Sequence, residues 1–192
     1  MAIIRVVDFS EYTGPISTDW FRRRNEEGIE GVVVQLWGGG NVPGRRNEYF
    51  HTSVDAAQAA GFTYIACYVW PPADIDVALD WLGQTKVDFV ALDVEANARL
   101  TQANVDMVRA AGQVPILYTN YPGFDLVENS VDRTLPLWLA RYKSVAAVPP
   151  VNLTGAWGNL TPKWTGPLVG WQYKGTTALN GESVDLNIFD DS

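Results

Sequence analysis

The sequence predicts an α/β fold, an irregular, TIM-barrel-like (β/α) barrel of about eight strands and five helices. Strand-like segments begin near residues 3, 31, 62, 88, 115 and 135 with helical patterns between them, which is the βα cadence of a parallel sheet. Two further strand-like segments follow near residues 169 and 184. A doubly wound open sheet is the rival architecture. The eight segments, and the polar and aromatic residues that stand at their ends, favour the barrel.

Apolar and β-branched runs that stop at glycine or proline define the elements of the first half of the chain. Ser17 or Thr18 can cap the first helix, and Gly28 ends it. The pair Pro71-Pro72 ends the third strand, because proline cannot donate to the hydrogen bonds of a central strand. The expected elements are strands 3–10, 31–37 and 62–70, and helices from about 18 to 27, 47 to 60 and 73 to 83.

The second half of the chain follows the same pattern until the helices stop. The run Phe89 to Leu92 predicts a strand buried on both faces. Thr101 can cap the next helix, and Gly112 closes it. The expected elements are strands 88–95, 115–120, 135–142, 169–173 and 184–189, a helix over 101–111 and a short helical segment near 122–129. No linker divides the chain, so residues 1–192 are expected to form a single domain.

Composition and charge exclude several classes of function. A formal net charge of −8 argues against nucleic-acid binding, which depends on basic patches. No apolar stretch is long enough to cross a membrane, and the N-terminus lacks a signal-peptide pattern. Cys67 is the only cysteine, so no intrachain disulfide or cysteine-rich zinc site is expected. His51 is the only histidine, and its polar helical surroundings argue against a catalytic role.

The fourth strand ends in two carboxylates, Asp93 and Glu95. Side chains at positions i and i+2 of a strand point the same way, roughly 6–7 Å apart. Like charges at that distance raise the proton affinity of one group, which yields a proton donor beside an ionised partner. An isolated pair of this kind is more often a solvated strand end. Here the other strand ends favour a functional interpretation.

Acidic, aromatic and amide residues stand at the ends of the other strands, where the active site of a βα barrel forms. Aromatic faces can stack on the apolar face of a sugar ring, while amides bind its hydroxyl or acetamido groups. The sequence therefore predicts a cleft for a neutral, hydroxyl-rich sugar. The candidate catalytic residues are Glu95, Asp93, Asp8 and Asp185, and the candidate substrate-binding residues are Trp37, Tyr68, Trp70, Tyr118, Asn120, Tyr142 and Gln172.

An ordered set of motifs resembles the family 25 glycoside hydrolases, the Chalaropsis-type lysozymes. Asp8-Phe-Ser10 followed by Tyr12-x-Gly14 is similar to their opening Asp-x-Ser-x-Trp-x-Gly, and Leu92-Asp-Val-Glu95 to their central Asp-x-Glu strand. Further similarities cover nearly the whole chain, in the order 116–119, 137–142, 171–173 and 184–189. Each motif is weak alone, but the ordered set is specific. The family has an irregular barrel of eight strands and about five helices.

The resemblance implies hydrolysis of the β-1,4 bond from N-acetylmuramic acid to N-acetylglucosamine in peptidoglycan. Glu95 would be the general acid and later the base, while Asp93 would stay ionised and raise the proton affinity of Glu95. Asp8 and Asp185 would position the sugar or the attacking water. Whether an Asp or the acetamido group of the substrate is the nucleophile stays open. No metal or cofactor is implied.

The resemblance also implies a partner and a place of action. The expected partner is peptidoglycan or a related glycan, with neither nucleic acid nor a membrane involved. A single catalytic domain is most simply a monomer. Its expected place of action is outside the cell or at the cell wall, as a secreted protein or a phage lysin.

Two departures from the family pattern keep other functions open. The third strand usually ends in Tyr-His-Phe or similar, whereas this chain has Tyr68-Val-Trp70. The second strand usually ends in a Lys-Ala-Thr-like segment, whereas this chain has Gln35-Leu-Trp37. Both positions are expected to line the substrate groove. The alternatives are a glycosidase acting on another N-acetylated glycan, and a catalytically silent glycan-binding or phage structural protein.

Overall fold

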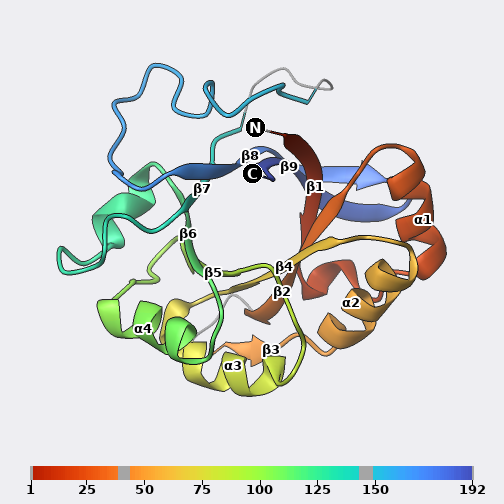
Figure 1. The fold of residues 1–192 in the computed structure, drawn as a ribbon, viewed down its shortest axis with the longest axis horizontal. Coiled ribbons are helices and arrows are strands. Elements are labelled where there is room, and N and C mark those ends of the chain that lie inside the picture. Colours follow the sequence, from red (N-terminus) through yellow and green to blue (C-terminus); the bar gives the residue numbers. More distant parts are fainter. Residues whose placement is uncertain (1, 39–43, 143–148, 192) are drawn as a thin grey trace.

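The computed structural model describes residues 2–38, 44–142 and 149–191. Within them the strands form one sheet in the order β1-β9-β8-β7-β6-β5-β4-β2-β3, and the pairing of β1 with β2 closes it into a barrel (Figure 1). The two-residue strand β3 lies outside the closed ring, which therefore has eight strands as predicted. The strands are β1 (Ile3–Phe9), β2 (Gly31–Gly38), β3 (Arg45–Arg46), β4 (Tyr64–Val69), β5 (Val90–Val94), β6 (Pro115–Asn120), β7 (Leu137–Ala140), β8 (Leu168–Leu179) and β9 (Glu182–Asp190).

The last strand of the barrel runs against the others. Strands β1, β2 and β4 to β8 pair in parallel around the ring, whereas β9 is antiparallel to both β8 and β1. The parallel pairing that the βα cadence predicts therefore holds for seven strands of the ring, and β9 departs from it. The reason is local: Asn180 and Gly181, with φ of 48° and 92°, form a tight turn that joins β8 directly to β9. An Asn-Gly pair between two strands is the usual signal for such a hairpin.

Four α-helices lie in the described ranges, α1 (Thr18–Glu26), α2 (Phe50–Ala59), α3 (Ile75–Leu82) and α4 (Gln102–Ala110). The hydroxyls of Ser17 and Thr101 accept hydrogen bonds from the first turns of α1 and α4, as their sequences predict. The fifth expected helix is a 3-10 helix, η3 (Pro122–Leu126), and two others are η1 (Glu11–Thr13) and η2 (Pro72–Asp74). Within this part of the chain no helix has the length and apolar character to cross a membrane.

The alternation of side chains along the strands divides the apolar residues into two cores. One face points into the barrel and contributes a cluster that includes Val6, Val33, Ala91, Ile116 and Phe189. The other face packs beneath the helices, where the ring centroid of Phe21 lies 5.4 Å from that of Phe62. Because these strands are buried on both faces, their sequences are nearly continuous apolar runs.

The side of the barrel formed by β7 and β8 carries no α-helix among the described residues, and the irregular segment 149–167 lies over it instead (Figure 1). Trp157 and Trp164 of this segment stack on Phe124 of η3, with ring centroids 5.8 and 6.0 Å apart. The indole of Trp164 donates a hydrogen bond of 2.7 Å to the carbonyl of Leu135. Large aromatic side chains thus bury this face without a helix.

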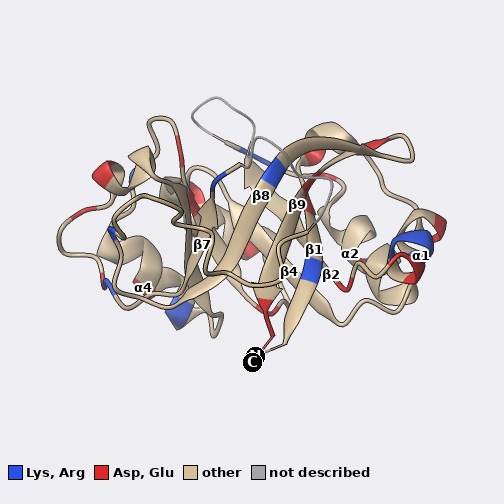
Figure 2. Ribbon diagram, turned by 90° about the horizontal axis from the view of Figure 1, so that it is seen from above, with Lys and Arg blue, Asp and Glu red and all other residues tan. Residues whose placement is uncertain are grey.

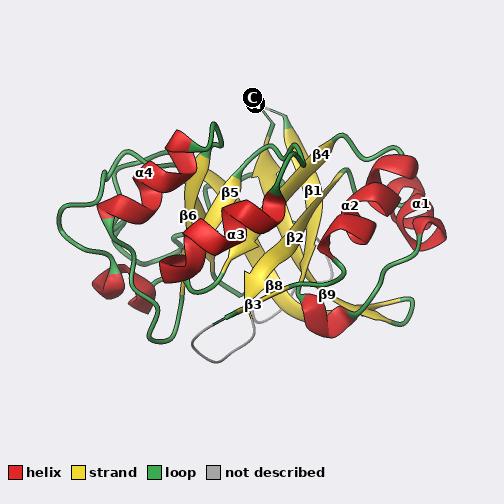
Figure 3. Ribbon diagram, turned by 90° about the horizontal axis from the view of Figure 1, so that it is seen from below, coloured by secondary structure: helices red, strands yellow, loops and turns green. Residues whose placement is uncertain are grey.

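The two ends of the barrel are different. The chain termini meet at one end, where the amide of Asp191 donates to the carbonyl of Ala2 over 2.9 Å. The β8–β9 hairpin and β3 lie toward the opposite end (Figure 3). Basic residues are dispersed among acidic ones in the view of Figure 2. The carboxyl ends of the parallel strands, and the functional site, lie away from the termini.

Candidate active site

The four carboxyl groups predicted at the strand ends line one cavity of about 120 Å³. Asp8 comes from β1, Asp93 from β5, Glu95 from the residue just after β5, and Asp185 from β9. Because β9 is antiparallel, its early residue Asp185 lies beside Asp8. The other residues that line the cavity are Tyr68, Tyr118, Trp138, Tyr142 and Gln172.

Gln172 connects two of these carboxyl groups to two tyrosines. Its side-chain NH2 group donates to Asp8 Oδ2 over 3.0 Å and to Asp185 Oδ2 over 3.1 Å. Its side-chain oxygen accepts hydrogen bonds from the hydroxyls of Tyr118 and Tyr142, over 2.9 and 3.0 Å. Both amide hydrogens and both oxygen lone pairs are therefore used. A single buried amide holds four side chains of the site in place.

Asp8 accepts hydrogen bonds from two side-chain amides. Besides Gln172 it accepts from Asn187 Nδ2 over 2.7 Å, and the indole of Trp138 donates to Asn187 Oδ1 over 3.0 Å. Burial, followed by the charge of Asp185, raises the pKa of Asp8 to about 8, although the bonds from Gln172 and Asn187 act in the opposite direction. The Asp8 carboxyl therefore keeps its proton at neutral pH.

Asp185 is held by an irregularity in the hairpin. The register of β8 against β9 shifts between Lys174 and Thr177, and the amide of Thr176 donates to Asp185 Oδ1 over 2.5 Å. Burial raises the pKa of Asp185, and the bond from Thr176 lowers it. The bulge thus turns a backbone donor toward the site.

Asp93 is the carboxyl group that lacks donors. It is buried, and its Oδ1 atom has no hydrogen-bond partner among the described residues. Burial, and after it the charges of Glu95 and Asp8, raises the pKa of Asp93 well above its usual range. The raised pKa opposes the expectation that Asp93 stays ionised, because the ionised form would be desolvated with an unpaired oxygen.

Glu95 is half-buried and faces the cavity. Its Oε1 atom accepts a hydrogen bond from Asn120 Nδ2 over 3.2 Å, and the amide of Gly123 donates to Asn120 Oδ1 over 3.0 Å. Burial raises the pKa of Glu95, the bond from Asn120 lowers it, and the charge of Asp185 raises it. The raised pKa agrees with the sequence prediction, but its cause is burial first. The next residue, Ala96, has a φ of 53° and turns the chain away.

Three of the predicted substrate-binding residues do not line this cavity: Trp37, Trp70 and Asn120. Asn120 stands behind Glu95, to which it donates a hydrogen bond. The indole of Trp37 donates to Asp74 over 2.9 Å, and its ring lines a neighbouring groove. The register of β2 against β4 shifts between Gln35 and Trp37, so Trp37 pairs with Val69 and leaves the inward face. Trp70 lies beyond the end of β4, and its indole nitrogen is buried without a partner among the described residues.

The two departures from the family pattern do not line the cavity either. Val69 is buried in the core beneath the helices, whereas its neighbour Tyr68 faces the carboxyl groups. The expectation that position 69 lines the groove is wrong, because successive side chains of a strand alternate faces. Gln35 is also buried, and its side-chain oxygen accepts from the amide of Glu11 over 3.1 Å. The Gln35 side chain therefore fixes the start of η1 by this hydrogen bond and does not face the substrate cavity.

Two buried residues of the site were not predicted, Trp138 and Asn187. Trp138 lines the cavity, and its ring centroid lies 4.3 Å from that of Tyr118. Its indole donates a hydrogen bond to Asn187, which in turn donates to Asp8. The signal for Asn187 was present in the sequence, since it stands two residues after Asp185 on the same face. His51 bonds Thr85 and the carbonyl of Trp81, apart from the cavity. Across the described ranges, no His, Cys, Asp and Glu cluster has the arrangement of a metal site.

Replacing Gln172 with Leu is expected to lower the free energy of unfolding by about 1–3 kcal/mol, because buried donors and acceptors lose their partner. The loss should be larger at about pH 9 than at about pH 5, since the bond from Gln172 favours the ionised form of Asp8. Urea unfolding at both pH values measures this. Gln58→Leu, on the exposed face of α2, is the control. An equal loss at both pH values would contradict the bridging role.

Comparison with known proteins agrees with this geometry. The model of "Glycosyl hydrolases family 25" matches residues 7–182. Similar solved structures include the CTP1L endolysin (20% identity, TM-score 0.68, 98% of this chain and 67% of that one) and a muramidase from Trichobolus zukalii (21%, 0.64, 98% and 94%). A family 25 glycosyl hydrolase from Bacillus anthracis is 17% identical, with a TM-score of 0.64 over 98% of this chain and 89% of that one. A search of curated proteins found no match. The family model spans most of the chain, so this protein belongs to glycosyl hydrolase family 25.

Proposed function

We propose that this chain hydrolyses the β-1,4 bond between N-acetylmuramic acid and N-acetylglucosamine in peptidoglycan. The observation that carries the proposal is the placement of Glu95, a half-exposed carboxyl of raised pKa, in a cavity with three further carboxyl groups. Similar structures described as an endolysin and as muramidases support the choice of substrate. The action would then take place at the cell wall, by a monomer that reaches it through secretion or phage lysis.

Glu95 would transfer the proton in both halves of the reaction. Its raised pKa keeps a proton available to the leaving glycosidic oxygen as the bond to the anomeric carbon breaks. The carboxylate that remains then takes a proton from the water that attacks the anomeric carbon. The bond from Asn120 Nδ2 to Glu95 Oε1 fixes the orientation of the carboxyl group. Asp8 and Asp185, which both accept hydrogen bonds from Gln172, would position the sugar or this water.

Asp93 has a feature that favours an N-acetylated substrate. Its buried Oδ1 atom lacks a donor among the described residues, and the N–H of an acetamido group can supply one. Such a bond would favour the ionised form of Asp93 and lower its pKa when substrate binds. In the substrate-assisted route Asp93 then directs the acetamido oxygen to the anomeric carbon. In the competing route Asp93 itself attacks that carbon.

Digestion of purified peptidoglycan tests the proposal. We expect new reducing ends on N-acetylmuramic acid, identified by mass spectrometry after borohydride reduction. Chemically de-N-acetylated wall is the matched substrate, and we expect about a 10²-fold slower release from it, because the contact with Asp93 is lost. If reducing ends were released only from another N-acetylated glycan, that glycan would be the substrate in place of peptidoglycan. Retention of wall without release of ends would instead identify a glycan-binding protein.

A further inference from the structure

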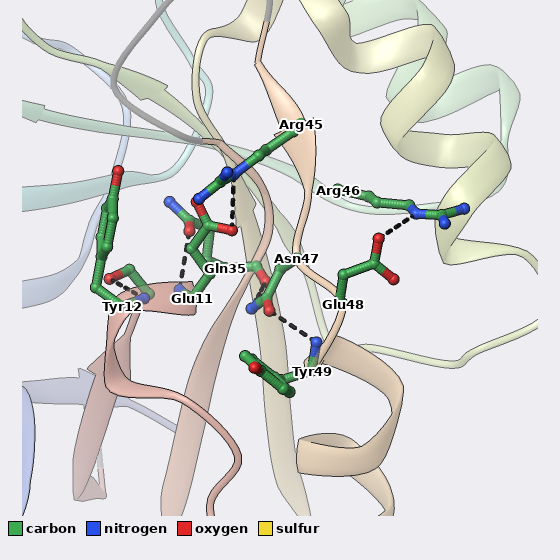
Figure 4. Close-up of polar contacts among 9 residues, drawn as sticks. Glu11, Tyr12, Gln35, Arg45, Arg46, Asn47, Glu48 and Tyr49 are labelled. Carbon is green, nitrogen blue, oxygen red and sulfur yellow. Dashed lines mark hydrogen bonds and ion pairs between the residues drawn. The ribbon is translucent and has the colours of Figure 1, made fainter.

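A second and larger groove lies beside the active site, between η1 and the segment that carries β3 (Figure 4). Its volume is about 630 Å³. We call it the β3 groove. It is lined by Glu11, Tyr12, Trp37, Gly44, Arg45, Arg46, Glu48 and Tyr49.

The β3 groove adjoins the active site through an intermediate hollow that shares lining residues with both. This hollow, of about 440 Å³, shares Asp8, Tyr68 and Asp185 with the catalytic cavity. The same hollow shares Tyr12 with the β3 groove. A polymer that enters the catalytic cavity can therefore extend through the hollow into the β3 groove.

The β3 groove has balanced charge but unused hydrogen-bond donors. Arg45 Nε contacts both carboxylate oxygens of Glu11, at 2.9 and 3.0 Å, and Arg46 Nε contacts Glu48 Oε1 at 2.7 Å (Figure 4). Two cations thus face two anions. These pairs use only the Nε atoms, and the terminal nitrogens of Arg45 form no hydrogen bond within the described ranges. The guanidinium of Arg46 instead lies over the ring of Trp81, 4.8 Å from its centroid. The side chains of Arg45 and Arg46 are both more than half exposed, 66% and 53%.

The groove also has aromatic walls. Tyr12 and Tyr49 are exposed, while Trp37 is half-buried with its indole N–H already bonded to Asp74. Flat aromatic faces beside fork-shaped donors suit a ring that has apolar faces and an oxygen-rich rim. The balanced charge favours a neutral occupant, since an anion would have to approach Glu11 and Glu48 as well as the two arginines.

We propose that the β3 groove is a distal subsite that binds a neutral N-acetylated sugar of the same glycan strand, beyond the units at the point of cleavage. The proposal rests on the proposed function, because the strand is the substrate. The aromatic rings would stack on the sugar, and the terminal nitrogens of Arg45 would donate to its hydroxyl and acetamido oxygens. The groove would then make the protein prefer long glycan strands to short fragments.

The double variant Arg45→Gln and Tyr49→Ser tests the subsite through substrate length. Gln keeps a donor for Glu11, and Ser is a preferred residue at the N-cap position that Tyr49 occupies just before α2, so folding should be preserved. On long uncrosslinked strands we expect kcat/KM to fall about tenfold, against about twofold or less on the shortest cleavable fragment. Arg22→Gln, which removes an exposed arginine paired with Asp19 on α1, should change neither. Equal losses on both substrates, or no loss on either, would overturn the proposal.

A binding measurement separates this inference from the proposed function. In the Glu95→Gln background, calorimetry with triacetylchitotriose, a neutral probe, should show about fivefold weaker binding when the double change is added. Raising the salt concentration should have little effect on this difference. If no variant hydrolyses wall but this difference holds, the hydrolase proposal fails and the subsite stands. An unchanged affinity would overturn the subsite, as would a stronger, salt-sensitive preference for a negatively charged muramoyl peptide.

Discussion

The change of Glu95 to Gln is expected to lower the rate of wall hydrolysis by about 10²–10⁴-fold, the contribution that general acid catalysis makes. Glutamine keeps the size of the side chain and can still meet Asn120, but it has no proton to transfer to the leaving oxygen. The measurement is release of reducing sugar from peptidoglycan by the two proteins. Glycan binding should survive, because the walls of the cavity are unchanged.

Two controls make this result specific to the carboxyl group. Thermal melting should be nearly unchanged, and Glu26→Gln, at an exposed position of α1, should leave the rate unaltered. In the wild-type protein the rate should fall as pH rises past the raised pKa of Glu95, because the acid loses its proton. Equal rates for the wild type and Glu95→Gln, or a rate that still climbs above neutral pH, would exclude Glu95 as the acid.

Asn in place of Asp93 is expected to stabilise the fold while it abolishes most activity. Burial raises the pKa of Asp93 and of Asp8 in the folded protein, so both carboxyl groups hold their protons more tightly than in the unfolded chain, where the usual pKa is about 3.8. The stability that this gives is complete at low pH and is lost as pH rises through the folded-state pKa values, for Asp8 about 8. At a pH above these folded-state pKa values, the free energy of unfolding of Asp93→Asn should exceed that of the wild type by about 1–2 kcal/mol. Its rate of wall hydrolysis should fall by about 10²-fold or more.

Melting temperatures across this pH range test the prediction. The wild type should melt at progressively lower temperature from about pH 4 to about pH 8, and Asp93→Asn should show a weaker decline, with a gain of roughly 2–8 °C at the alkaline end. Asp55→Asn, at an exposed position of α2, should follow the wild-type curve. A wild type that becomes more stable as pH rises would show that Asp93 and Asp8 are ionised in the folded protein.

Much of the fold follows from local patterns in the sequence. Apolar runs such as Phe89 to Leu92 predicted strands buried on both faces, and Ser17 and Thr101 predicted where helices begin. The direction of the last strand, β9, was not predicted, although the sequence carries a local signal for it. Asn180-Gly181 specifies a hairpin, and that hairpin reverses the closing strand. Helices after residue 142 were not expected, and in the described ranges aromatic stacking on Phe124 buries that face instead.

The sequence alone determined which carboxyl groups meet, because strand ends in a barrel converge on one rim: Asp8, Asp93, Glu95 and Asp185 line the same cavity. Only the tertiary structure decided which of these carboxyl groups favour the protonated form. Asp93 favours its protonated form because it is buried with an unpaired oxygen, whereas Asp8 has donors from Gln172 and Asn187 and still has a raised pKa. Burial and hydrogen bonding depend on neighbours far apart in the chain, and no spacing of residues encodes them.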